Sequence, residues 1–227
     1  MAAIHQAFPF WNALTELQQA AMLDYTIIRH CAPGESLKKR AGLYIVGDGS
    51  IALYSSHESG RRRVVFSAHW MECLLLTPAF LADSSTLSLE LFAREVSEIW
   101  FIPYEEWQEA EEWLPEIRDY TVELMSSQMS SLIFGVSARM EKNISKRLAL
   151  FLHRFYERSR AHNGDTLHIS HEELAEQVGT TREAVTRNVN ILKDAGLVQT
   201  GRGKIRIIDP DALQAYANTE SKFDEEE

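Results

Sequence analysis

The sequence predicts an α+β protein: an N-terminal β-roll of the jelly-roll type, then one long helix, then a C-terminal winged helix-turn-helix. Three patterns support this prediction. Short apolar segments separated by turn residues fill the first half of the chain, and a proline-free stretch with helical periodicity follows them. Two helix patterns with start signals, joined at a glycine, then precede a short hairpin. At 227 residues, with 45% of them hydrophobic, the chain is long enough for two globular domains.

The β-roll is expected from six short segments that are apolar or alternate between apolar and polar residues. Turn residues separate them, at Pro33-Gly34, at 47–49 and at 58–60. Many short strands with hairpin turns are typical of a roll, barrel or sandwich. A helix at 13–23 is expected to cap the domain. The strands are expected at residues 25–31, 43–46, 51–55, 63–67, 89–94 and 98–102.

A long helix is expected after the strands, where the apolar period changes from 2 to 3.6. A short helix at 105–113 comes first. Pro115 suits the first position of the next helix, which runs to residue 140 over roughly 35 Å at 1.5 Å per residue. Its apolar side chains form two stripes. One stripe consists of Ile117, Tyr120 and Leu124, and the other of Val122, Met125, Met129, Leu132 and Val136.

Two apolar faces on one helix need two partners. We expect one face to pack on the roll and the other on the same helix of a second chain, so that residues 117–140 form a parallel two-fold homodimer. A single core helix enclosed within one chain is the alternative. A joint is expected at 140–143, after which Asn143 or Ser145 starts a further helix at 144–160.

The helix-turn-helix pattern begins with a helix that has both a start signal and a stop signal. Ser170 can accept a backbone N–H bond while Glu173, three residues on, can reach back, as in a capping box. Gly179 stands where the chain must turn, because glycine reaches left-handed backbone angles without steric cost. Thr180 and Glu183 are expected to form a second capping box.

The second helix, at 181–195, has one apolar face and one polar face. Val185, Val189 and Leu192 lie at i, i+4 and i+7 on the apolar face. Gly196 ends the helix, and a short hairpin with a Gly-Arg-Gly turn follows as the wing. The polar face carries Arg182, Glu183, Thr186, Arg187 and Asn190.

The polar face has the chemistry of base recognition in the major groove. Arginine can donate two hydrogen bonds to guanine O6 and N7, and glutamate can accept from cytosine N4, each contact contributing about 1–3 kcal/mol of discrimination. The same residue types on a helix surface are usually solvated charges with weak i,i+4 pairing. Here two capped helices, a glycine turn and a basic wing occur together, and this combination favours DNA reading.

The charge of the chain is distributed unevenly. The net charge of −10 by itself argues against a nucleic-acid partner. Residues 141–208, however, contain 12 Lys and Arg against 8 Asp and Glu, a net charge of +4. Contacts to DNA phosphates are expected from side chains in this region: Ser170, Thr180, Thr181, Lys193, Arg202, Lys204 and Arg206.

The expected organisation has four parts. Residues 1–113 form a sensor domain, 114–140 the dimerisation helix and 141–208 the winged helix-turn-helix. Residues 209–227 form a C-terminal segment with one lysine against seven acidic residues, and we expect its acidic tail to be disordered.

These elements in this order resemble the family of the cyclic-AMP receptor protein and the fumarate-nitrate regulator, the Crp/Fnr family. The resemblance covers about residues 10–210. It is strongest at Gly179 to Leu197, where Thr-Arg-Glu-Ala-Val-Thr-Arg at 181–187 is similar to the family's Ser/Thr-Arg-Glu-x-hydrophobic-x-Arg motif. Residues 43–51 resemble the strand-glycine-strand hairpin of the family's cyclic-nucleotide-binding-like roll.

The resemblance implies roles for the residues of the reading motif. Arg182, Glu183 and Arg187 would read bases on half-sites that contain a TG step, with Thr186 as an additional reader. A two-fold dimer places its reading helices about 34 Å apart, so the resemblance also implies a palindromic site with half-sites one helical turn apart.

The departures from the family concern its best-known ligands. Cyclic-nucleotide binders use a Gly-Glu pair and a downstream Arg-Ser/Thr-Ala, where residues 71–73 here are Met-Glu-Cys and 87–89 are Leu-Ser-Leu. A leucine cannot neutralise a phosphate, so cyclic AMP is not expected as the effector. Iron–sulfur members carry an N-terminal cysteine cluster, and Cys31 and Cys73 alone cannot supply four thiolates.

What the roll senses stays open at this stage. The apolar residues at 73–81 either line a pocket beside the long helix or belong to the hydrophobic core. A thiol among leucines is expected to have a raised pKa and low reactivity. No metal site is expected. The candidate pocket residues are Glu72, Cys73, Leu76, Leu87, Leu124 and Gln128.

The sequence therefore predicts a homodimeric transcription regulator that reads a palindromic DNA site and is gated at the roll by a signal other than cyclic AMP. A ligand-independent DNA-binding dimer whose roll is only a scaffold is the alternative. An activator of this kind would also contact RNA polymerase. An enzyme is not expected, because the chain lacks Gly-x-Ser-x-Gly, a phosphate loop and His-Glu-x-x-His. With no apolar run of membrane-spanning length and no secretory signal, a cytoplasmic location is expected.

Overall fold

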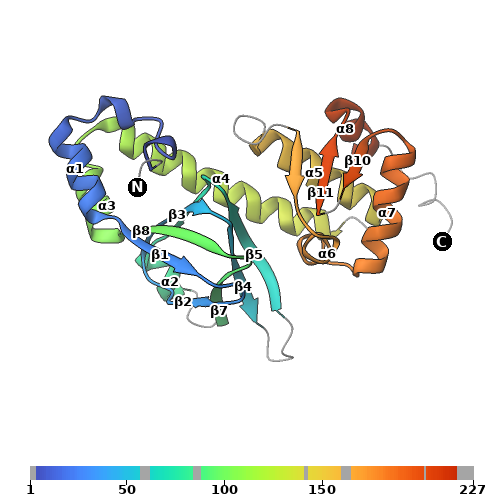
Figure 1. Ribbon diagram of the computed structural model, residues 1–227, viewed down its shortest axis with the longest axis horizontal. Coiled ribbons are helices and arrows are strands. Elements are labelled where there is room, and N and C mark those ends of the chain that lie inside the picture. Colours follow the sequence, from blue (N-terminus) through green and yellow to red (C-terminus); the bar gives the residue numbers. More distant parts are fainter. Residues whose placement is uncertain are drawn as a thin grey trace. The chain divides into compact units, whose positions relative to one another are not determined.

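The structure is a computed structural model that describes residues 4–56, 62–83, 88–140, 143–159, 165–201 and 203–218. It divides into two compact units, Met1–Leu132 and Ile133–Glu227. Strands β1 to β8 belong to the first unit, and β9 to β11 form a small sheet among the helices of the second (Figure 1).

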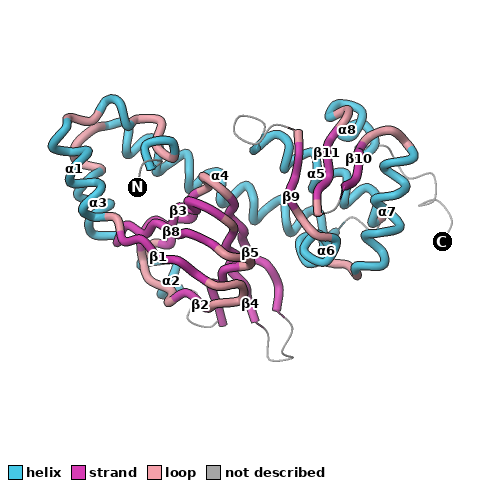
Figure 2. The backbone as a smooth tube through the Cα atoms, viewed as in Figure 1, coloured by secondary structure: helices cyan, strands magenta, loops and turns pink. Residues whose placement is uncertain are grey.

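The strands described in the first unit form two antiparallel sheets of four strands each, with the orders β1-β8-β3-β6 and β2-β7-β4-β5 (Figure 2). Strands far apart in the sequence pair with each other, as β1 does with β8 and β2 with β7. This pairing makes the roll, so the predicted architecture is confirmed. The strands are β1 (Ile27–Cys31), β2 (Ser36–Leu37), β3 (Gly42–Asp48), β4 (Ser50–Ser56), β5 (Arg62–His69), β6 (Cys73–Leu76), β7 (Ser88–Ala93) and β8 (Ser97–Pro103).

The sheet that contains β6 is buried on both faces. Successive side chains of a strand point to opposite faces, so Leu74 and Leu76 pack between the two sheets. Cys73 and Leu75 pack on the other face, against the helices of the unit. A strand buried on both faces shows no apolar alternation, which is why residues 73–76 were not predicted as a strand.

Helices cover the outer face of that sheet. The structure has α1 (Glu16–Tyr25), α2 (Pro78–Asp83), α3 (Tyr104–Ala110) and α4 (Pro115–Met140) in this part of the chain. Phe8 and Phe10 pack against Trp107 of α3 and Tyr120 of α4, with ring centroids 5.4–6.4 Å apart. The predicted packing of one face of α4 on the roll is confirmed, because Ile117 is fully buried in this cluster. Within the described residues, no helix is long and apolar enough to span a membrane.

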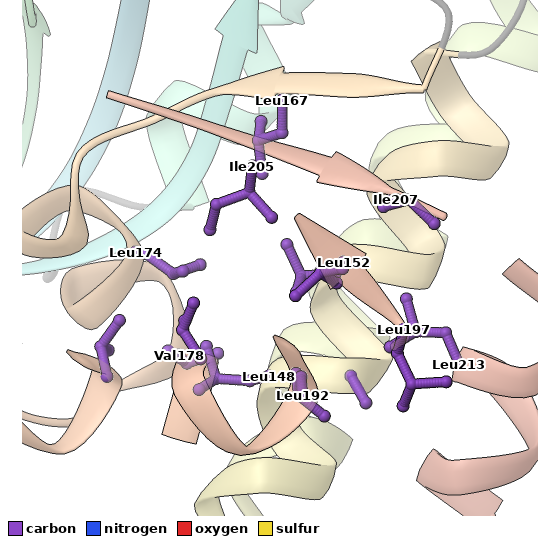
Figure 3. Close-up of a cluster of buried hydrophobic side chains, with 14 of the residues drawn as sticks. Leu148, Leu152, Leu167, Leu174, Val178, Leu192, Leu197, Ile205, Ile207 and Leu213 are labelled. Carbon is purple, nitrogen blue, oxygen red and sulfur yellow. The ribbon is translucent and has the colours of Figure 1, made fainter. Parts of the chain in front are cut away.

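The second unit is a three-stranded antiparallel sheet, in the order β10-β11-β9, packed with helices. Its elements are α5 (Ile144–Ser159), β9 (Thr166–His168), α6 (His171–Val178), α7 (Arg182–Asp194), β10 (Val198–Gly201), β11 (Lys204–Ile207) and α8 (Pro210–Asn218). Leucines from four helices meet isoleucines of β11 in one core (Figure 3). The labelled members are Leu148, Leu152, Leu167, Leu174, Val178, Leu192, Leu197, Ile205, Ile207 and Leu213.

Helix α8 corrects the prediction for the C-terminal segment. The segment 209–227 was assigned to no element, but its first half folds as α8, and Leu213 is fully buried against α5. Pro210 at the first helical position and the i, i+4 pair Leu213 and Ala217 are the local signals, which the acidic charge of the segment obscured. The acidic tail at 219–227 lies outside the described residues.

Candidate nucleic-acid interface

The first helix of the pair, α6, is fixed at both ends. Its capping box is present as predicted: Ser170 Oγ accepts from the Glu173 N–H at 3.2 Å, and Glu173 Oε2 accepts from the Ser170 N–H at 2.8 Å. The helix ends at Gly179, whose φ of 69° is left-handed. Arg147 Nη1 donates to the carbonyl oxygens of Val178 at 3.0 Å and Gly179 at 3.3 Å, so a side chain of α5 satisfies the last carbonyls of α6.

The cap of α7 differs from the prediction by one residue. Thr181, not Thr180, is the N-cap, and its Oγ1 accepts from the Ala184 N–H at 3.2 Å. Thr180 belongs to the turn, because its N–H donates to the Ala175 carbonyl at 2.9 Å and completes the end of α6. The capping box predicted for Thr180 and Glu183 is therefore wrong, and Glu183 stays on the exposed side of the first turn of α7.

The two faces of α7 are separated as the sequence predicts. Ala184, Val185, Val189 and Leu192 are buried. The five side chains of the polar face are all exposed: Arg182, Glu183, Thr186, Arg187 and Asn190.

The C-terminal end of α7 is closed by hydrogen bonds that lead into the wing. Gly196 has a φ of 74°, and its N–H donates to the Lys193 carbonyl at 2.9 Å. The Leu197 N–H donates to the Leu192 carbonyl at 3.0 Å, which completes a glycine-ended cap with a buried leucine after it. Because both ends of α7 are fixed, its polar side chains project from a rigid backbone.

A partly buried hydrogen bond joins α7 to the start of α5. The Ser145 hydroxyl is hydrogen bonded to Asn188 Oδ1, and Asn188 Nδ2 donates to the Ala184 carbonyl at 2.7 Å. Ser145 is buried near the start of α5, and Asn143 Oδ1 accepts from its N–H at 2.9 Å as the N-cap of that helix. Sequence patterns gave no signal for this contact, because its partners are 43 residues apart.

The start of α6, the start of α7 and the wing converge on one hollow. Gly203 in the wing turn accepts a hydrogen bond from the Ile169 N–H at 3.1 Å, which holds the turn beside the N-terminus of α6. Arg182 and Lys204 bring positive charge to the hollow, and backbone N–H groups at a helix N-terminus bind anions. The residues that line it are Ile169, Ser170, His171, Glu172, Arg182, Gly201, Gly203, Lys204 and Ile205.

The other described residues that are predicted to contact phosphates lie in the turn before α7, at the two ends of α7 and in β11. Thr181 and Lys193 are exposed, as is Arg206 in the wing strand β11, while Thr180 is half-buried. Arg202 lies outside the described residues.

Comparison with known proteins agrees with this architecture. Residues 146–216 match the family model of the Crp-like helix-turn-helix domain. The cyclic AMP receptor protein of Thermus thermophilus is 25% identical over 175 residues, which are 77% of this chain and 79% of that protein. The transcriptional activator protein Anr of Pseudomonas aeruginosa is 25% identical over 198 residues, which are 81% of this chain and 80% of that protein.

A solved structure extends the match to almost the whole chain. A transcriptional regulator of the Crp/Fnr family from Eubacterium rectale is 28% identical, with a TM-score of 0.61. The alignment covers 94% of this chain and all of that one. These similarities support placing the chain among the transcription regulators of the Crp/Fnr family. It is a transcription regulator with a helix-turn-helix DNA-binding domain.

The protein has an apolar hollow between the roll and α4. About 200 Å³ in volume, it is lined by no charged side chain of the described residues. Gln128 of α4 closes one side of it: its Oε1 accepts from the Leu75 N–H at 2.7 Å and its Nε2 donates to the Leu75 carbonyl at 3.1 Å. The lining residues are Leu53, Val65, Phe66, Leu74, Leu75, Leu76, Thr77, Phe80, Met125, Gln128, Met129 and Leu132.

The structure divides the six predicted pocket residues between different places. Leu76 and Gln128 line the hollow. Cys73 and Leu124 pack on the opposite face of β6 instead, because strand alternation separates Cys73 from Leu76. Glu72 lies in the turn between β5 and β6, where its Oε2 accepts from the His69 N–H at 3.0 Å. Leu87 lies outside the described residues.

The thiol of Cys73 is buried against Tyr120 of α4. Tyr120 Oη donates to Cys73 Sγ at 3.2 Å. Burial raises the pKa of the Cys73 thiol to about 12, and burial likewise raises the pKa of Tyr120. Both groups are therefore protonated at neutral pH. Across the described part of the chain, no three His, Cys, Asp or Glu side chains are grouped so that they can hold a metal ion.

We expect iodoacetamide to alkylate Cys73 slowly in the folded protein, measured by mass spectrometry in a Cys31→Ser background. The thiolate is the reactive form, and the folded thiol ionises only near pH 12 rather than near the usual 9.0. Between pH 8 and 10 the rate in urea should therefore rise steeply, while the native rate stays at least about tenfold lower. Since the unfolded chain loses this proton first, the thiol also lowers the free energy of unfolding as pH rises above 9.0.

A native alkylation rate that levels off near pH 9.0, as the rate in urea does, would contradict a buried, protonated thiol. Cys73→Ser in the same background measures alkylation at other side chains.

Proposed function

We propose that this regulator reads base edges in the major groove with α7, using Arg182, Glu183 and Arg187 as its main readers. Thr186 and Asn190 are additional readers on the same face. The observation that carries this proposal is the exposed polar face of a helix that is capped at both ends and buried on its other face. Such a helix presents its donors and acceptors in fixed directions, as base recognition requires.

Phosphate contacts flank the reading face in this proposal. Ser170 and Lys204 line the hollow beside the N-terminus of α6, where a phosphate would meet backbone N–H groups and Arg182. Thr180, Thr181, Lys193, Arg202 and Arg206 supply further contacts along the backbone. These contacts give the salt-dependent part of the affinity.

The second apolar face of α4 pairs with the same face of a second chain. Val122 is 63% exposed and Met129 59%, although both are large and apolar. Met125, Leu132 and Val136 continue the stripe and are also exposed. A self-complementary stripe on a helix suits a parallel two-fold dimer, which would bring two copies of α7 to half-sites about 34 Å apart. Residues 1–113 then form the sensor, 114–140 the dimerisation helix and 141–208 the DNA-binding domain.

The roll senses a small, uncharged, apolar effector in the hollow beside α4. A cavity of about 150 Å³ lined by apolar side chains accepts a molecule the size of benzene. The hollow measures about 200 Å³ and has Gln128 and Thr77 as its polar lining side chains. Because Met125, Met129 and Leu132 belong to both the hollow and the dimer stripe, a bound molecule changes the surface that the partner helix meets.

A ligand-independent dimer is the second candidate. The observation in its favour is that packing of a partner helix on Met125 and Met129 would also cover the hollow without any effector. In either case the regulator acts in the cytoplasm, and where it activates it also contacts RNA polymerase.

Arg187→Ala should weaken binding to the selected DNA site by about 10- to 100-fold, because a bidentate contact to guanine contributes about 1–3 kcal/mol. Fluorescence anisotropy with a site selected from random DNA measures this, and binding to unselected DNA should change much less. Arg29→Ala, which removes the same charge from an exposed position on β1, is the matched control. Equal losses on selected and unselected DNA would rule out base reading by Arg187.

Val122→Glu should shift the protein from dimer to monomer in sedimentation equilibrium, raising the dimer dissociation constant about 100-fold or more, because the new carboxylate would be buried between two apolar stripes. Ser130→Glu adds the same charge at an exposed position off the stripe and should leave the dimer intact. A dimer that tolerates Val122→Glu as well as Ser130→Glu would place the interface elsewhere.

A panel of uncharged single-ring compounds should include members that raise the melting temperature of the full chain and change its affinity for the selected site. A ligand present at 100 times its Kd stabilises the folded state by about 2.7 kcal/mol. Val65→Phe fills the hollow and should abolish both effects, while Val96→Phe, at a valine that is 73% exposed, should preserve them. Unchanged melting and unchanged DNA affinity across the panel would favour the ligand-independent dimer.

A further inference from the structure

A chain of hydrogen bonds joins the two helices of the helix-turn-helix at Thr186. The Thr186 hydroxyl donates to the Arg182 carbonyl one turn earlier in α7, at 2.9 Å. Nδ1 of His171, the first residue of α6, lies 3.0 Å from the same hydroxyl oxygen. A hydroxyl has one hydrogen, and here it points to the Arg182 carbonyl, so we assign Nδ1 as the donor of the bond to Thr186 Oγ1.

These two hydrogen bonds limit the contacts that the Thr186 side chain can make with DNA bases. Its hydroxyl has no hydrogen left for the acceptors that guanine, adenine and thymine present in the major groove. The bond from His171 holds the side chain in one rotamer, with the oxygen directed toward the backbone of α7 and toward α6. Thr186 is exposed, so its γ-methyl group is the part left for a contact in the groove.

Thymine is the base whose edge can make an apolar contact with the γ-methyl of Thr186. Thymine alone presents a methyl, at C5, in the major groove, and threonine methyls make apolar contacts with it. Arg182 and Arg187, which flank Thr186 on the exposed face of α7, supply the polar contacts beside it.

We propose that His171 is a positioning residue for DNA specificity, which holds Thr186 so that its γ-methyl meets the 5-methyl of a thymine in each half-site. The proposal rests on the proposed function and adds to it a base, thymine, and a residue on the other helix. His171 acts through Thr186 and needs no contact of its own with a base.

A direct contact of His171 with a phosphate is the competing role. Its ring also lines the hollow that contains Ser170, Glu172, Arg182 and Lys204, where a phosphate is proposed to lie. The two roles differ in their effect. Loss of a phosphate contact weakens binding to every DNA alike, whereas loss of positioning weakens only the preference for the thymine methyl.

The test removes the thymine methyl from the DNA. A site is first selected from random DNA with the wild-type protein, and each thymine of one half-site is then replaced singly by deoxyuridine. The ratio of the two Kd values, deoxyuridine over thymine, is measured at each position. For the wild type we expect a ratio of about four at one thymine, as for the loss of one buried methyl group, and a ratio near one elsewhere.

Variants of Thr186 and His171 then test whether these two residues cause the preference for thymine over deoxyuridine. Thr186→Val should keep the ratio, because valine retains a methyl at this position and, unlike threonine, keeps one rotamer in a helix without a hydrogen bond. Thr186→Ser lacks the methyl and should bring the ratio to one. His171→Ala should bring the ratio close to one, and His171→Asn, whose amide nitrogen can donate from about the place of Nδ1, should restore it. Glu172→Ala, which changes another side chain of the hollow, should leave the ratio unchanged.

Each measurement is a ratio for one protein, so a variant that is less stable or less active does not distort it. A wild-type ratio of one at every thymine of a selected site overturns this inference and leaves the proposed function standing. A His171→Ala variant that binds both DNAs more weakly with the wild-type ratio overturns the positioning role in favour of a phosphate contact. Failure of the wild type to select any sequence overturns the proposed function together with this inference.

Discussion

The burial of one face of α7 is the constraint on which the proposed DNA-reading surface depends. Val185, Val189 and Leu192 are fully buried, and they pack in a core shared with α5, α6 and β10. Since side chains on a helix are spaced by about 100°, fixing the buried face fixes the direction of every residue on the other face. The caps at Thr181 and Gly196 and the Ser145–Asn188 bond then hold the helix in that rotation. A reading helix without this core would have the same residues but no defined directions for them.

A comparable constraint acts in the roll, where one sheet is buried on both faces. One face of β6 packs between the sheets and the other packs against the helices, so neighbouring residues of this strand have different partners. β6 is also an edge strand, and an unpaired edge leaves backbone groups without partners. Gln128 provides those partners with two hydrogen bonds to Leu75, which ties α4 to the sheet at the rim of the apolar hollow. The same helix therefore pairs with the edge of the roll, lines the hollow and carries the exposed apolar stripe. For this reason an effector bound in the hollow could alter the proposed dimer surface through α4.

The sequence predicted the helix-turn-helix closely and the sensor domain less well. In the DNA-binding domain, the Ser170 cap, the turn at Gly179, the end at Gly196 and the two faces of α7 follow from residues within four positions of each other. The wrong cap at Thr180 shows the limit of such patterns, because two threonines in succession both fit a capping motif and only the hydrogen bond from Thr180 to Ala175 separates them. In the sensor domain, Leu76 and Gln128 line one hollow, whereas Cys73 and Leu124 lie on the other face of β6. The strand at 73–76 has no alternating pattern to reveal which side chains face the same way.

The sequence by itself determined the order of the β-roll, the long helix and the winged helix-turn-helix, the apolar faces of α4 and α7, and the motif that carries the family resemblance. These properties depend on local periodicity and on short-range hydrogen bonds, which neighbouring residues encode. Only the tertiary structure decided that Arg147 closes the end of α6, that Gln128 pairs with the edge of β6, and that His171 fixes the hydroxyl of Thr186. Each of these contacts joins side chains from separate elements, so it exists only after the hydrophobic cores have brought those elements together.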